Sequence, residues 1–207
     1  RKFGHKEGAR TFRKIVSYCK ELGIKYITFY AFSTENWKRP KDEVEAIMAL
    51  FDQYLDEVRK HTKENIRVMF IGDKSAFDEN FRNKMIALEE DSKDFDAMTL
   101  ILAINYGGRD DIIYAAKQVG EFVKEGVIFS SQIDESLFSN LLYTKGVPEV
   151  DYIIRPSGEL RLSNFLIWQA AYAEYYFTDV LWPDFDKKDL DKALSEFKNR
   201  KRRFGGV

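Results

Sequence analysis

The sequence predicts an α/β protein in which a mostly parallel central sheet is flanked by helices. Short β-branched and aromatic segments alternate with amphipathic segments of helical period, and the connections between them are short. The chain contains no repeat, no low-complexity tract and no Pro/Gly linker, so no domain boundary is visible. Its 207 residues, 44% of them hydrophobic, suffice to bury a substantial core. We therefore expect one domain over residues 1–207.

The first half of the chain begins with a helix. Residues 12–22 carry apolar side chains at helical spacing, and Gly23 follows as a stop signal. Residues 24–32 are β-branched and aromatic, which is typical of a buried strand. Pro40 begins a second helix, which continues to Val58 with an apolar stripe on one face. The next strand is predicted at residues 66–71, closed by a Gly-Asp pair.

The second half continues the alternation of helices and strands. MTLILAIN, at residues 98–105, is the most strongly predicted buried strand, and a Tyr-Gly-Gly sequence ends it. A short strand at residues 150–154 leads into an arginine-bearing loop. A strand is also expected at residues 175–181, and helices are expected at residues 77–88, 109–124, 164–172 and 187–203.

Composition excludes several classes of protein. A net charge of −1 gives no bulk attraction to nucleic acid, so no nucleic-acid partner is expected. The single cysteine, Cys19, excludes an intramolecular disulfide and a cysteine-based zinc site. No apolar window approaches the length of a membrane span and no signal peptide is visible, so the sequence predicts a cytoplasmic protein. The chain opens on Arg1 rather than Met, which predicts further residues upstream.

The segment 155–185 combines residues that seldom need to be neighbours. Arg155 and Arg161 bracket a Ser-Gly pair, a dense apolar run follows, and Glu174 lies within that apolar setting. Guanidinium groups bind phosphate bidentately, and a lone carboxylate can bind Mg²⁺ when the substrate supplies phosphate oxygens. The combination predicts a substrate with a phosphorylated head and an apolar body. The plainer interpretation is a set of surface ion pairs in which Glu159 orients the arginines.

A second polar motif, residues 33–40, follows the first strand and opens a helix. Its hydroxyls, its amide and Arg39 could bind a phosphate, with Trp37 as the wall of an apolar pocket; a helix-capping loop with a packed Trp is the alternative. Ligands of open α/β sheets gather at the carboxyl ends of the strands. Residues 33–40, 106–109 and 155–163 all follow strands, and this arrangement predicts a single active site.

Other segments carry weaker signals. A Gly-His-Lys-x-Gly sequence around His5 precedes the first predicted helix, where a phosphate contact is one reading and a structural histidine is the other. The basic run at residues 198–203 is typical of a solvated helix end. Neither a phosphate-binding loop of the Gly-x-x-x-x-Gly-Lys-Ser/Thr type nor an Asp-rich diphosphate clamp is present.

Three long motifs resemble those of the cis-prenyltransferases, and the bacterial undecaprenyl diphosphate synthases in particular. They are FSTENWKRP at residues 32–40, NYGGR at residues 105–109 and IRPSGELRLSNFLIWQAAYAEYYFTDVLWPDF at residues 154–185. The opening RKFGHKEGA and the closing RRFGG fit as well, so that the resemblance runs along the whole chain.

The resemblance implies repeated Mg²⁺-dependent condensation of isopentenyl diphosphate onto an allylic diphosphate, usually farnesyl diphosphate. It also implies an apolar tunnel whose depth sets product length. The 44–58 stripe, for which a packed core is the plainer reading, and Met98 would line it. The product would be a long polyprenyl diphosphate, such as undecaprenyl diphosphate for a cell-wall lipid carrier. The expected enzyme is a homodimer that meets the inner membrane face peripherally to release its product.

The same resemblance implies roles for individual residues. The pocket for the isopentenyl diphosphate head would contain Arg155, Arg161, Leu162 and Ser163. Contacts to the allylic diphosphate would come from Arg1, His5 and Arg39. The loop that places both substrates would contain Ser33, Thr34, Glu35, Asn36 and Trp37. Glu174 would act on magnesium directly or through a neighbour, near the dimer interface, and Arg203 and Gly205 would form an Arg-x-Gly ending that reaches the partner's active site.

Asn36 is the residue to which the family's proton-acceptor role is sometimes given. A neutral amide is a poor base, so we expect Asn36 to orient substrate by hydrogen bonding, with the departing diphosphate as an alternative proton acceptor.

One family motif, Asp-Gly-Asn-Gly-Arg-Trp, is absent; the resemblance places it, with an N-terminal strand, just upstream of Arg1. Its Asp is the principal magnesium and diphosphate residue, so a polypeptide beginning at Arg1 is expected to show little activity and to lack one strand. The alternative functions are a non-catalytic scaffold subunit of the same fold, a polyprenyl-phosphate binding or carrier protein and, third, a nucleotide-binding module.

Overall fold

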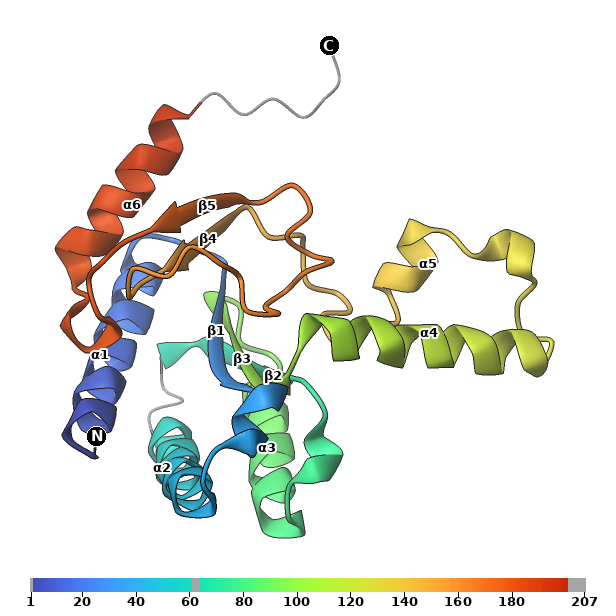
Figure 1. The fold of residues 1–207 in the computed structure, drawn as a ribbon, viewed down its shortest axis with the longest axis horizontal. Coiled ribbons are helices and arrows are strands. Elements are labelled where there is room, and N and C mark those ends of the chain that lie inside the picture. The colour runs from blue at the N-terminus through green and yellow to red at the C-terminus, as the bar shows by residue number, and fades with distance from the viewer. Residues whose placement is uncertain (1, 61–63, 201–207) are drawn as a thin grey trace. The chain divides into compact units, whose positions relative to one another are not determined.

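A computed structural model describes the backbone of residues 2–60 and 64–200, and the side chains of residues 7–55 and 64–200 (Figure 1). The chain falls into two compact units. One unit is Gly23–Val147, and the other combines Arg1–Leu22 with Pro148–Val207. Each unit contains its own parallel sheet.

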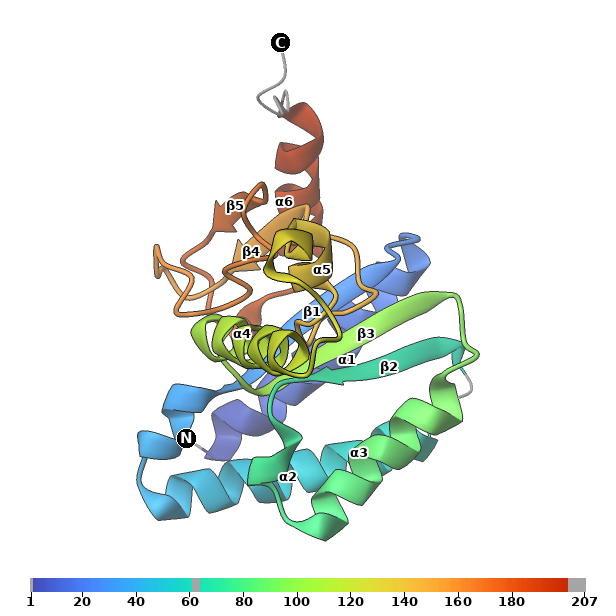
Figure 2. The same ribbon diagram turned by 90° about the vertical axis from the view of Figure 1, so that its right-hand side faces the viewer.

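The unit Gly23–Val147 is built on a three-stranded sheet. Its strands are β1 (Tyr26–Ser33), β2 (Ile66–Ile71) and β3 (Met98–Tyr106), in the order β1-β3-β2 and all parallel. β3 is central and almost entirely buried, as its unbroken apolar sequence predicts. Helices α2 (Lys41–Lys60) and α3 (Glu79–Ser92) cover the same face of this sheet, below the strands in Figure 2.

Two further helices follow the central strand. α4 (Gly108–Lys124) begins two residues after β3 ends, and α5 (Glu135–Ser139) lies beside it (Figure 1). Single 3-10 turns occupy Thr34–Lys38 (η1), Lys74–Ala76 (η3) and Ser130–Gln132 (η4). The carboxyl ends of β1 and β3 therefore both lead directly into helical turns, whose first N–H groups are directed toward the edge of the sheet.

The other unit consists of α1 (Lys2–Glu21), β4 (Tyr152–Arg155), β5 (Glu174–Phe177), the 3-10 turn η5 (Trp182–Asp184) and α6 (Lys187–Asn199). β4 and β5 pair in parallel. The indole of Trp182 donates to the carbonyl of Gly8 at 3.0 Å, and a Cβ on Gly8 would lie 3.3 Å from that ring. Gly8 thus allows α1 to approach η5 closely, a structural reason for the glycine in the Gly-His-Lys-x-Gly sequence.

The α/β class and the parallel pairing of strands are confirmed, and every predicted strand is present within a few residues of its expected bounds. One helix prediction was wrong: residues 164–172 form a run of turns. Ser163, Asn164 and Leu166 adopt positive φ angles of 50°, 66° and 45°, which a right-handed helix does not allow. The first helix starts at Lys2, so His5 lies within it rather than before it.

The single-domain prediction and the apolar tunnel stay predictions. Across the described residues, no helix has both the length and the apolar character needed to cross a membrane.

Candidate active site

The loop after β1 carries five of the predicted substrate residues, Ser33 to Trp37, on and just before η1. Asn36 folds back on the loop, where its Oδ1 accepts a hydrogen bond from the Ser33 N–H at 2.9 Å. The hydroxyl of Thr34 donates to Oδ2 of Asp110 at 3.0 Å, while Glu35 is exposed. Within this unit the loop is therefore joined to the start of α4, where Asp110 lies.

Trp37 is fixed by three neighbours. Its Nε1–H donates to Oδ1 of Asn105 at 2.7 Å. Its ring meets Phe32 edge-on at a centroid distance of 5.1 Å and Phe77 at 5.8 Å. Trp37 nevertheless stays 39% exposed, so part of this residue remains accessible to a ligand.

Arg39 follows η1 and is exposed. Its guanidinium pairs with Glu43 at 2.7 Å, one turn along α2. An exposed i,i+4 pair contributes about 0.5 kcal/mol or less, so a diphosphate can take over this guanidinium at small cost.

The NYGGR segment supports the loop from the neighbouring strand β3. Asp111, in the first turn of α4, is buried and accepts from the Tyr106 hydroxyl at 3.0 Å and from the Tyr143 N–H at 2.8 Å. Tyr30 donates to the carbonyl of Tyr106 at 3.1 Å. Burial, with the nearby charge of Glu35, raises the pKa of Tyr30 to about 12. Tyr30 therefore stays neutral at physiological pH.

The loop after β4 is organised by Arg155. Its Nη1 donates to the carbonyl of Arg161 and, at 2.9 Å, to the hydroxyl of Ser163. Arg155 thus closes the loop that it begins and holds Ser163 beside it. The guanidinium is partly buried and keeps donors that an anion can use.

Two backbone contacts fix the turn within this loop. Ser157 and Gly158 have φ angles of 84° and 73°, and their N–H groups donate to Val180 and Thr178 at 2.8 Å each. A Cβ on Gly158 would lie 2.9 Å from Oδ1 of Asp179.

Arg161 lies at the far side of the same loop. Its side chain is 64% exposed and pairs with Glu159 at 2.5 Å, as the sequence analysis anticipated for Glu159. Leu162, next to it, is half-buried. Arg161 is therefore the more available of the two loop arginines.

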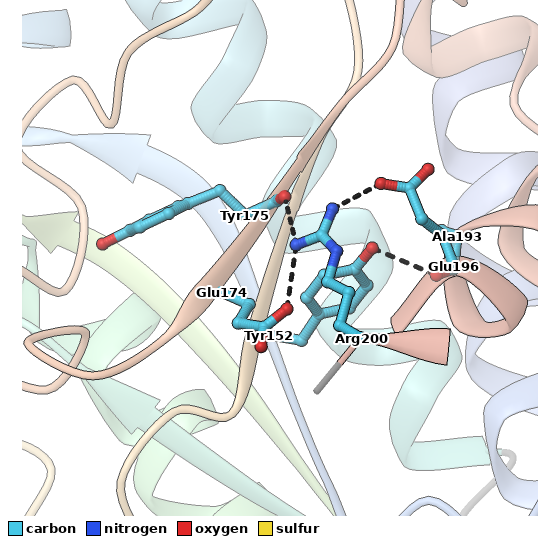
Figure 3. A network of polar contacts seen from close by, with 6 residues as sticks. All are labelled: Tyr152, Glu174, Tyr175, Ala193, Glu196 and Arg200. Carbon is cyan, nitrogen blue, oxygen red and sulfur yellow. Dashed lines mark hydrogen bonds and ion pairs between the residues drawn. The ribbon is translucent and has the colours of Figure 1, made fainter. Parts of the chain in front are cut away.

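Glu174 begins β5 and forms an ion pair that the sequence analysis missed. Arg200, at the end of α6, donates to Oε2 of Glu174 at 3.0 Å, to the carbonyl of Tyr175 at 3.0 Å, and to Glu196 (Figure 3). The guanidinium lies 5.6 Å from the centre of the Tyr152 ring. The basic run 198–203 was interpreted as a solvated helix end, but Arg200 is half-buried and paired with both carboxylates, whose hydrogen bonds raise its pKa. Since Glu174 is 26 residues away, no local spacing could reveal the pair.

Glu174 is the residue that was predicted to act on a metal ion. Its carboxylate is paired with Arg200, and among the described side chains, those of residues 7–55 and 64–200, no three His, Cys, Asp or Glu are grouped to hold a metal ion. The described residues therefore do not form a metal site by themselves.

The other predicted residues cannot be related to either loop. Arg1, Arg203 and Gly205 lie outside the described residues, as does the side chain of His5. A depression beside α4 and α5, lined by Phe122, Leu137 and Leu141 among others, contains none of the predicted site residues.

Arginines on strand-end loops of a parallel α/β framework are typical of proteins that bind phosphorylated ligands. The family model described as "Putative undecaprenyl diphosphate synthase" matches residues 1–205, and the chain belongs to this prenyltransferase family. The predicted prenyltransferase activity is thereby confirmed over the scaffold and carrier alternatives.

Individual relatives agree with the family. The chain is 49% identical to an isoprenyl transferase of Clostridium perfringens over 208 residues, which cover all of this chain and 82% of the relative. It is 49% identical to a farnesyl-diphosphate-specific ditrans,polycis-undecaprenyl-diphosphate synthase of Pasteurella multocida, covering 99% and 86% of the two chains. A crystal structure of lavandulyl diphosphate synthase from Lavandula x intermedia, in complex with dimethylallyl diphosphate, matches with a TM-score of 0.93 and 37% identity, covering 98% and 88% of the two chains.

Proposed function

We propose that this enzyme condenses isopentenyl diphosphate repeatedly onto farnesyl diphosphate. The product would be a long cis-polyprenyl diphosphate, such as undecaprenyl diphosphate for a cell-wall lipid carrier. The substrates follow from the names of the relatives, and the observation that carries the proposal is the loop from Arg155 to Ser163. This loop combines two guanidinium groups, a hydroxyl and a turn of fixed backbone beside a strand end, which suits a diphosphate.

The proposed chemistry needs charge stabilisation and exclusion of water. When the allylic C–O bond breaks, an allylic cation forms and negative charge grows on the departing diphosphate. Arg39, with Arg1 and His5, would stabilise that leaving group, while Arg155, Arg161 and Ser163 would bind the isopentenyl diphosphate head beside Leu162. The apolar face of Trp37 would keep water from the cation. The new carbon–carbon bond forms as the double bond of isopentenyl diphosphate attacks, and loss of a proton completes the step.

Asn36 would orient a substrate rather than accept the proton. Its Oδ1 already accepts from the Ser33 N–H, so the group that it presents to a ligand is the N–H donor of its amide. A diphosphate oxygen is the natural acceptor for such a donor. The departing diphosphate is then the base that remains available for the proton.

Magnesium would enter with the substrates. Mg²⁺ retains water and phosphate oxygens in its coordination shell and is often bound by only one or two carboxylates. Because the described residues do not complete a metal site, we assign Glu174 the role of holding Arg200 and derive no step through the ion.

Assembly and location are part of the proposal. Both units expose large apolar side chains, including Phe129 (71%), Leu160 (76%) and Tyr172 (71%), as an interface or a membrane contact requires. We infer a cytoplasmic homodimer that touches the membrane peripherally, with Arg203 and Gly205 directed to the partner's site. Sedimentation velocity with and without anionic vesicles tests the dimer and the membrane contact. A monomer that does not bind the vesicles would contradict both.

Product analysis tests the function. The protein is incubated with farnesyl diphosphate, radiolabelled isopentenyl diphosphate and Mg²⁺, and the extracted products are separated by chain length. A ladder that ends in long polyprenyl diphosphates is expected, and it should collapse when EDTA is added. Binding of farnesyl diphosphate without any longer product would instead support a carrier.

A further inference from the structure

We propose that Asn105 is a positioning residue that fixes the indole of Trp37 for substrate. Asn105 is the penultimate residue of β3, and Trp37 lies in the loop after the adjacent strand β1. Their side chains are joined by the 2.7 Å hydrogen bond from Nε1 of Trp37 to Oδ1 of Asn105. Asn105 is only 6% exposed, whereas Trp37 is 39% exposed, so a buried amide fixes a ring that stays open to a ligand.

The amide of Asn105 is itself fixed by its other atom. Its Nδ2 donates to the backbone carbonyl of Asp73 at 2.9 Å, and the Asp73 N–H donates back to the Asn105 carbonyl at 3.2 Å. This pair of bonds leaves Oδ1 directed at the indole. A buried amide whose donor and acceptor are both satisfied is held in one orientation.

The backbone at this position explains why an asparagine is suited to it. Asn105 has a φ of 49°, in the left-handed region that Asn tolerates better than most residues. The segment after β2 approaches the end of β3 so closely that a Cβ on Gly72 would lie 2.2 Å from the carbonyl oxygen of Ile104. Few side chains combine this backbone with both a donor and an acceptor.

The hydrogen bond decides how the ring is turned. Phe32 and Phe77 contact the Trp37 ring, but apolar contacts alone allow the ring to flip about its χ2 axis. The bond to Asn105 selects one of the two orientations. Because η1 carries both Asn36 and Trp37, fixing the ring also fixes the loop that would place the substrates; this consequence rests on the proposed function.

Two variants and one matched control test the proposal. Asn105→Gly keeps the left-handed backbone and removes both side-chain bonds, while Asn105→Asp keeps an acceptor for the indole. The control is Asn65→Gly: Asn65 also has a positive φ, of 56°, and a side-chain hydrogen bond, to Asp96, but it does not contact Trp37. Circular dichroism melting confirms that each variant is folded.

The first readout is independent of activity. The protein has three tryptophans, so its ¹⁵N spectrum contains three indole N–H signals, and Trp37→Phe assigns one of them. We expect the Trp37 signal to shift upfield and its hydrogen exchange to accelerate at least about tenfold in Asn105→Gly. Asn105→Asp should keep the signal downfield, and Asn65→Gly should leave it unchanged. An unshifted Trp37 signal in Asn105→Gly would overturn the positioning role whatever the enzyme makes.

The second readout is the split between KM and kcat. Asn105→Gly should raise the KM for the allylic diphosphate about tenfold with a change in kcat of less than about threefold, because binding is disturbed more than bond breaking. Asn105→Asp should recover part of that loss. An equal KM rise in Asn65→Gly, or an unchanged KM despite a shifted indole signal, would overturn the link to substrate. Absence of product from the unsubstituted protein would contradict only the proposed function. The indole signals would still test the hydrogen bond between Trp37 and Asn105.

Discussion

The two strand-end loops carry similar predicted roles but are held in different ways. The loop after β1 is supported from outside: Thr34 bonds to Asp110 in α4, and Trp37 bonds to Asn105 near the end of the neighbouring strand β3. The loop after β4 supports itself, because Arg155 bonds to the Arg161 carbonyl and the Ser163 hydroxyl. An arginine predicted to bind substrate can therefore be a structural part of its own site.

The way in which each loop is held distinguishes three arginines to which the sequence assigns the same role. Arg39, Arg155 and Arg161 were all predicted to bind diphosphate. Arg39 and Arg161 each pair with one exposed or half-buried carboxylate that a substrate can displace, whereas Arg155 is built into the loop. Substitution of Arg155 should therefore affect both stability and activity, and substitution of the other two should affect activity alone.

The largest effect is expected for Arg155→Gln. It removes a guanidinium from the proposed diphosphate pocket and opens the loop, so kcat/KM should fall about 1,000-fold, which corresponds to about 4 kcal/mol. The melting temperature should fall as well. Arg155→Lys keeps the charge but loses the planar guanidinium that can donate two hydrogen bonds at once. We expect it to recover less than about a tenth of the lost activity. Full recovery by Lys would show that only the charge of Arg155 matters.

A pair of glycine variants compares the supports of the two loops. Gly72→Ala, beneath the first loop, would place a Cβ 2.2 Å from a backbone oxygen at a φ of 117°, and we expect a loss of about 3 kcal/mol in the free energy of unfolding. Gly158→Ala, in the second loop, meets only the end of the Asp179 side chain and should cost about 1 kcal/mol. Urea titration measures the free energy of unfolding of both variants. A larger loss for Gly158→Ala than for Gly72→Ala would contradict the conclusion that the first loop rests on the more rigid backbone.

Asn36→Asp tests the role of the amide in the first loop. The carboxylate can still accept from the Ser33 N–H, so the melting temperature should change little. It cannot donate to a diphosphate and would repel it, so kcat/KM should fall about 100-fold. The measurement is a pH–rate profile of both proteins. Near-normal turnover with a shifted profile would show that residue 36 accepts the proton.

Sequence reasoning recovered the fold class because periodicity and propensity act locally. The unbroken apolar run of β3 and the apolar stripe of α2 marked these elements within a few residues. It failed at residues 164–172, where apolar spacing suggests a helix but Leu166 is buried through a left-handed turn. Tertiary burial can impose the same spacing without a helix, and the sequence alone does not distinguish the two cases.

The site was predictable where residues lie next to each other in the chain. The motifs of residues 33–40 and 155–163 identified the two loops, and the Glu159–Arg161 pair belongs to the plainer interpretation of the second motif as surface ion pairs. The contacts of Asn105 with Trp37 and of Arg200 with Glu174 were not, because each joins segments that only the fold brings together. Such supporting residues carry no chemical signature of their own.

The central claim, that the two loops bind different substrates, is tested most directly by a crossed kinetic measurement on Arg39→Gln and Arg161→Gln. Each variant removes one guanidinium with a single carboxylate partner, so the two are closely matched. Arg39→Gln should raise the KM for farnesyl diphosphate about tenfold and leave that for isopentenyl diphosphate within about twofold, and Arg161→Gln should do the opposite. If both variants raised the same KM, the assignment of one substrate to each loop would be contradicted.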